Sequence, residues 1–167
     1  MEPYVVIDGH GAMKLFEIYI KTTPERLWGA ITDPDLRARY SFGVRTDSEW
    51  TAGSPYSSGV PGAIDIAEGE NLVVEPPRRL VQSFKALWSD EVAQAGYSRV
   101  TWEIEPVGSS CRLRVTHTEL APESSGELFG GWPMILSGLK TLLETGEDLD
   151  TPGSLRYAPR AEAGQEA

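Results

Sequence analysis

His117 is the strongest candidate for chemistry in a chain that carries few such side chains. An imidazole titrates near physiological pH and can donate or accept a hydrogen bond, so it suits acid–base work or the orientation of a polar ligand. His117 follows Leu113 and Val115 on one face of an alternating run, and an apolar face of this kind points to the core. The alternative is a histidine that only satisfies a structural partner at the strand end, which is the more common situation.

Other nucleophilic or metal-binding arrangements are not supported by the spacing of the residues. Cys111 shares the face of His117, but six residues of extended chain separate the two by about 20 Å, so they cannot form a Cys–His pair, and we interpret Cys111 as a small buried hydrophobe. Asp8 and His10 offer two ligands where a metal site usually needs three or four. Motifs for a serine nucleophile elbow, a phosphate-binding loop, a zinc protease or a dithiol are absent from the sequence. We therefore assign no catalytic residue, no metal and no cofactor.

Arg78 and Arg79 follow two prolines at the start of an expected strand and form the one basic pair that could meet an anionic group. A solvated surface pair among many acidic residues is the more ordinary interpretation.

Trp132 lies within the strongest helical pattern in the second half of the chain, which begins at Phe129. Apolar residues recur there at spacings of three and four, which places them on one helix face: Phe129, Trp132, Leu136, Leu139 and Leu143. Trp102 lies on the apolar face of an expected strand. A helix that covers a sheet can leave a cavity between the two layers. We expect that cavity to be lined by Trp102, Val115, His117, Trp132 and Leu136, with simple core filling as the alternative.

The elements that position these residues are predicted from periodicity and from turn and capping signals. Alternation predicts a first strand over 14–21, and Thr23 with Pro24 and Asp33 with Pro34 predict two short helices over 24–31 and 34–40. Short strands are expected over 44–50, 57–60, 63–68 and 71–75, longer ones over 79–88 and 97–106, a hairpin partner over 111–118, and a last helix that ends at Gly146.

Composition limits the class of protein. The 167 residues suit one domain, and the net charge of −10 argues against nucleic acid or an anionic membrane as a partner. The single cysteine excludes an intramolecular disulfide, and neither a membrane-length apolar run nor a signal peptide is visible, so we expect a cytoplasmic protein without membrane insertion. We divide the chain into a leader (1–13), a helix-grip domain (14–150) and a flexible tail (151–167) that is dispensable for folding.

The order of one strand, two short helices, six strands and a long helix (β-αα-β6-α) resembles the START-like (SRPBCC, or Bet v-type helix-grip) superfamily. Five segments carry the resemblance in sequence order: 20–34, 75–81, 98–106, 113–117, and Gly131-Trp132 with Leu136 and Leu139. More narrowly, residues 14–145 resemble the family of activator of Hsp90 ATPase homologues in its stand-alone bacterial form. The resemblance implies an α+β fold in which an antiparallel sheet wraps around a long C-terminal helix.

The resemblance also implies a function, because this superfamily includes lipid and hormone carriers, polyketide cyclases and ring-hydroxylase subunits. We therefore expect a small hydrophobic or amphipathic ligand to bind in the cavity between the C-terminal helix and the sheet. Two alternatives stay open. One is a co-chaperone-like regulatory module with a protein partner or a homodimer, and the other is a cyclase- or hydrolase-type enzyme that uses the same cavity.

Overall fold

The computed structural model describes residues 4–8, 11–94, 96–120 and 131–150. They form one eight-stranded antiparallel sheet in the order β1-β2-β8-β7-β6-β5-β4-β3. The strands are β1 Tyr4–Asp8, β2 Gly11–Ile20, β3 Arg45–Ser48, β4 Pro55–Val60, β5 Ile64–Glu75, β6 Arg79–Ala86, β7 Ser98–Val107 and β8 Ser110–Leu120. The helices are α1 Pro24–Thr32, α2 Pro34–Tyr40, α3 Asp90–Gln94 and α5 Trp132–Thr145.

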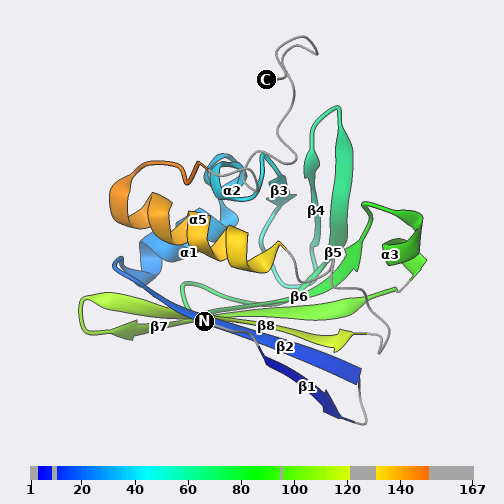
Figure 1. The fold of residues 1–167 in the computed structure, drawn as a ribbon, viewed down its shortest axis with the longest axis horizontal. Helices are drawn as coiled ribbons and strands as arrows, with labels where there is room; N and C mark the ends of the chain where they lie inside the picture. Colours follow the sequence, from blue (N-terminus) through cyan, green and yellow to red (C-terminus); the bar gives the residue numbers. More distant parts are fainter. Residues whose placement is uncertain (1–3, 9–10, 95, 121–130, 151–167) are drawn as a thin grey trace.

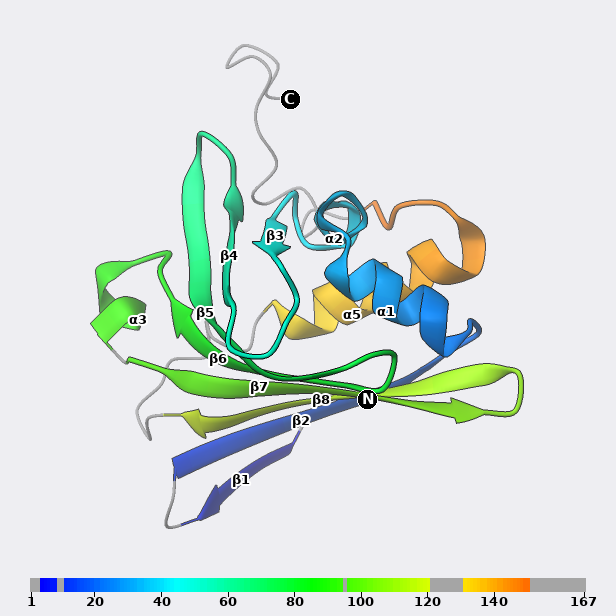
Figure 2. The same cartoon turned by 180° about the vertical axis from the view of Figure 1, so that it is seen from behind.

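The sheet curls so that β3, β4 and part of β5 rise beside the helices (Figure 1). Helices α1, α2 and α5 all lie on this concave side, as the view from behind also shows (Figure 2). The α+β helix-grip fold expected from the sequence is confirmed.

Local signals explain where the helices begin and end. The Thr23 hydroxyl accepts a hydrogen bond from the Arg26 N–H and caps α1, and Asp33 Oδ1 accepts from two backbone N–H groups and caps α2. Helix α5 ends at Gly146, whose φ of 81° is the left-handed conformation that glycine adopts easily, and whose N–H donates to the carbonyl of Leu142. These boundaries follow the predictions, except that α5 starts at Trp132, and Phe129 lies outside the described residues.

Three features of the sheet were not predicted. Strand β1 pairs with β2, which itself begins at Gly11, so the expected domain start at residue 14 falls inside a strand. The strands expected on either side of a turn at Gly69 are one continuous strand, β5. The strand expected to end at Trp88 ends at Ala86 and is followed by the short helix α3. The tail 151–167 and His10 lie outside the described residues.

Gly69 lies inside β5 because the backbone of β6 approaches it too closely for a side chain. A Cβ at this position would lie 2.0 Å from the carbonyl oxygen of Ser83. Glycine inside a strand often marks such a close approach and not a turn.

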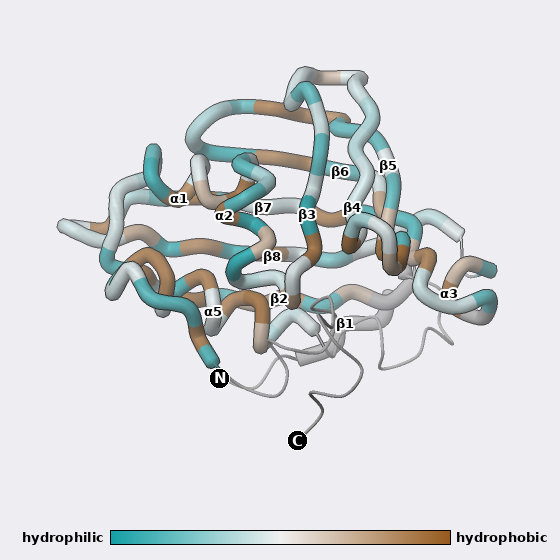
Figure 3. Tube along the Cα trace, turned by 90° about the horizontal axis from the view of Figure 1, so that it is seen from above, coloured by the Kyte–Doolittle hydropathy of each residue, from teal (hydrophilic) through white to brown (hydrophobic). Residues whose placement is uncertain are grey.

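The core lies between the concave face of the sheet and the three helices. Figure 3 shows hydrophobic segments on α5 and on the central strands β7 and β8. Alternate residues of β8 are buried, namely Cys111, Leu113, Val115 and His117, as the sequence predicted. Among the described residues, no helix is both long enough and apolar enough to cross a bilayer.

Two glycine substitutions test this account of the backbone. Gly69→Ala should lower the free energy of unfolding by on the order of 3 kcal/mol, because the new methyl group meets the backbone of β6. Gly29→Ala in α1 should raise it by about 1 kcal/mol, because no atom lies within 4 Å of the new Cβ and alanine favours helix. Urea unfolding of the two variants measures both, and equal effects would contradict the close contact at Gly69.

Candidate functional site

Strand register brings the candidate residues onto one patch of the concave face. Trp102 on β7 lies opposite Leu80 on β6 and opposite Val115 on β8, and Val115 lies opposite Phe16 on β2. These residues form one row across four strands. His117 lies two residues further along β8, on the same face and one row away.

Trp132, in the first turn of α5, covers this patch. Its ring centre lies 5.4 Å from that of Trp102, 6.2 Å from that of Phe16 and 6.4 Å from that of His117. The contacts with Trp102 and His117 are edge-on, the arrangement that aromatic rings favour. Leu136, one turn further along, is buried in the same core cluster. The structure thus brings together all five residues that the sequence singled out.

His117 is fully buried and forms a short chain of hydrogen bonds. Its Nε2 lies 2.6 Å from Ser98 Oγ, and Ser98 Oγ lies 3.3 Å from the carbonyl of Phe84. The indole N–H of Trp132 donates to His117 Nδ1 over 3.5 Å, which is long for a hydrogen bond. Burial lowers the pKa of His117 to about 4, so the ring is neutral at pH 7.

Ser98 Oγ contacts both His117 Nε2 and the carbonyl of Phe84, so its single proton can go to either one. The ring tautomer decides which atom of the Ser98–His117 pair donates. The arrangement holds a neutral imidazole, which is suited to orienting a ligand group.

Trp102 is 1% exposed, and its indole N–H has no hydrogen-bond partner among the described residues. The guanidinium carbon of Arg37, on α2, lies 5.0 Å from the centre of this ring. Sequence reasoning did not single out Arg37. Arg37 lies three residues before Tyr40, and positions three apart lie on the same face of a helix. Tyr40 is buried, so this face of α2 points inward.

The other side chains considered from the sequence lie away from this patch. Cys111 is buried, its thiol donates to the carbonyl of Thr22 over 3.3 Å, and burial raises its pKa, which fits a structural role. Arg78 and Arg79 line a hollow of about 560 Å³ on the sheet together with Glu103 and Arg112.

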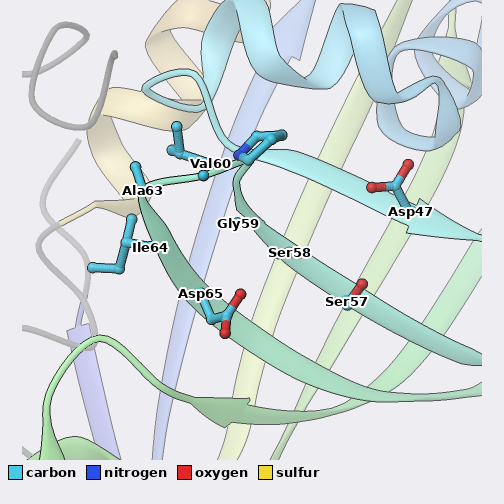
Figure 4. A pocket seen from close by; sticks show the side chains of 10 residues that line it. Asp47, Ser57, Ser58, Gly59, Val60, Ala63, Ile64 and Asp65 are labelled. Carbon is cyan, nitrogen blue, oxygen red and sulfur yellow. The ribbon is translucent and has the colours of Figure 1, made fainter. Parts of the chain in front are cut away.

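Further hollows lie at the surface. One of about 390 Å³ lies at the hairpin between β4 and β5, where the side chains of Asp47, Ser57 and Asp65 are seen around it (Figure 4). Another of about 550 Å³ lies between the α1–α2 junction and Trp50. None of these hollows is lined by the five candidate residues, among which Trp132 contacts Trp102 and His117.

The fold and the aromatic patch beneath the last helix define a helix-grip protein. The model of the family described as Activator of Hsp90 ATPase homolog 1-like protein matches residues 21–144, so the chain belongs to this family.

Solved structures share the fold. CalU16 from Micromonospora echinospora is 21% identical, with a TM-score of 0.66 over 87% of each chain. MLL2253 from Mesorhizobium loti is 25% identical, with a TM-score of 0.68 over 78% of this chain and 96% of its own. The Aha1 dimer from Colwellia psychrerythraea is 18% identical, with a TM-score of 0.63 over 80% of this chain and 97% of its own. No curated protein matches the chain.

The neutral state of His117 gives a prediction about pH. The pKa is about 4 when folded and near 6.5 when unfolded, so only the unfolded chain gains this proton as the pH falls from 6.5 towards 4. Protonation of His117 in the unfolded chain should therefore lower the free energy of unfolding by about 3 kcal/mol across that pH range. In His117→Gln this group cannot titrate, so the free energy of unfolding should fall less between pH 7 and pH 4.5 than it does in the wild type. Urea unfolding at the two pH values measures both. Parallel losses in the two proteins would contradict a buried neutral imidazole.

Proposed function

We propose that the protein binds a small hydrophobic or amphipathic molecule between α5 and the concave face of the sheet. The ligand contacts Trp102, Val115, His117, Trp132 and Leu136. The observation that carries this proposal is the buried indole N–H of Trp102, which has no hydrogen-bond partner among the described residues. A buried donor without an acceptor costs about 1–3 kcal/mol, which a ligand acceptor would recover.

Binding requires Trp132 to move aside, because its ring packs directly on Trp102 in this state. Near the C-terminal end of α5, Lys140 donates to the carbonyl of Tyr19 and Glu144 accepts from the N–H of Lys21. We place ligand entry at the opposite end of the helix, because the ring of Trp132 there covers Trp102.

Apolar burial supplies most of the affinity, at about 25 cal/mol for each Å² of surface removed from water. The polar groups then set the orientation, because His117 and the indole N–H of Trp102 are the polar groups of the patch. This division of roles is usual for pockets that hold small molecules.

A homodimer or another protein partner is the second candidate. The dimeric state of Colwellia Aha1 supports it. Strands β1 and β3 are the edges of the described sheet and offer backbone groups for pairing. If such a partner binds, the functional surface is a sheet edge and not the concave face.

A neutral fluorescent probe, N-phenyl-1-naphthylamine, tests the ligand proposal. It should bind one-to-one with little dependence on salt, because apolar burial is not screened. Val115→Thr adds a hydroxyl to the concave face at nearly constant volume and should weaken binding on the order of fivefold.

The control is Thr116→Val, the neighbouring residue on the opposite face of β8, which should leave probe affinity unchanged. Circular dichroism checks that both variants fold. Equal effects of the two substitutions, or no binding at all, would refute the proposal. Salt-sensitive capture of a protein without probe binding would favour the partner.

A further inference from the structure

Arg37 places a positive charge on the concave side of the molecule. It lies on α2, with its guanidinium against the ring of Trp102. One of its N–H groups donates to the carbonyl of Ile31 over 2.9 Å, in the last turn of α1. Burial raises the pKa of Tyr40 to about 12 and also raises that of Tyr56, and the charge of Arg37 opposes both shifts. Arg37 therefore lies where α2 faces the rising part of the sheet.

No carboxylate among the described residues balances this charge. The two nearest acids in sequence are engaged elsewhere: Asp33 caps α2, and Asp35 pairs with Arg45. Arg39, on the same helix, differs clearly, because it is exposed and pairs with Asp148 over 2.8 Å. Buried charges in proteins are usually paired, and the half-buried Arg37 has no carboxylate partner within the described residues.

Two buried donors meet at this point without acceptors. The Nε–H of Arg37 and the Nε1–H of Trp102 have no hydrogen-bond partner among the described residues. The groups that carry them are in contact, with the guanidinium carbon 5.0 Å from the ring centre. The hydroxyls of Tyr40 and Tyr56 donate to the carbonyls of Ala30 and Ser83, and neither accepts a hydrogen bond from these two donors.

We propose that the ligand is an amphipathic carboxylate whose anionic group binds between Arg37 and the indole N–H of Trp102. The apolar body of the ligand extends along the concave face beneath Trp132. A carboxylate fits because its two oxygens accept from neighbouring N–H groups, and hydrogen bonds with ionised partners are about twice as strong as neutral ones. This inference rests on the proposed binding between α5 and the sheet, and it adds the chemical class of the ligand.

The net charge of −10 does not oppose this binding strongly. At physiological ionic strength the field of exposed charges falls off over about 8 Å. The local charge of Arg37 therefore dominates at the site itself.

A matched pair of ligands tests the proposal: decanoate, which is ionised at pH 7.5, and decan-1-ol, which has the same chain without the charge. Displacement of N-phenyl-1-naphthylamine gives the affinity of each. The measured quantity is the ratio of decanoate affinity to decanol affinity in each protein. The ratio removes effects on the shared apolar chain and on overall stability.

Arg37→Met should lower that ratio about tenfold or more, since it removes the charged donor and keeps a side chain of similar length. Arg39→Met, on the exposed side of the same helix, should leave the ratio unchanged. Trp102→Phe keeps a ring beneath Arg37 but removes the indole N–H, and it should lower the ratio several-fold. Because Trp102→Phe leaves α2 intact, it provides the test if Arg37→Met does not fold.

The outcomes separate the two proposals. Decanol binding with no decanoate binding, or a ratio that is the same in the wild type and in Arg37→Met, would overturn the carboxylate site and leave the apolar site standing. Either result would leave Arg37 with a structural role only, through its hydrogen bond to the carbonyl of Ile31 in α1. Failure of both ligands to bind would overturn both proposals.

Discussion

The packing of Trp132 against the concave face of the sheet is the contact on which the rest of the structure depends. One indole touches three strands of the sheet through Phe16, Trp102 and His117. This contact fixes the height of α5 above the sheet at its first turn, and hydrogen bonds from Lys140 and to Glu144 fix its last turns. The buried core is continuous from β2 to β6 and includes residues of α1, α2 and α5.

Closing the helix over the sheet also encloses polar groups, and their state follows from burial. His117 stays neutral because a charge there would lose its hydration. The indole N–H of Trp102 and the Nε–H of Arg37 have no acceptor in the part of the chain that the structure describes. A helix-grip protein with a purely structural interior would gain stability from apolar residues at these positions. The proposed ligand would enter this space and supply an acceptor to these polar groups.

The sequence predicted the order of the main elements and the buried faces of β7 and β8, because alternation and helical spacing are local signals. It also placed the five candidate residues on faces that meet. Features that depend on other parts of the chain were missed. Gly69 was interpreted as a turn residue, because the contact that requires glycine there comes from the backbone of β6. Arg37 was not singled out, because the ring that it contacts comes from β7. Strand β1 is defined only by its pairing with β2.

The most direct test of the account is a two-dimensional ¹⁵N–¹H spectrum of the indole N–H groups during titration with decanoate. The chain has five tryptophans, and single Trp→Phe variants assign their signals. Trp102 and Trp132 should shift strongly and saturate together at one equivalent, while Trp28, Trp50 and Trp88 should change little. Shifts confined to Trp28, Trp50 or Trp88, or no saturable shift at any of the five, would contradict a ligand site beneath α5.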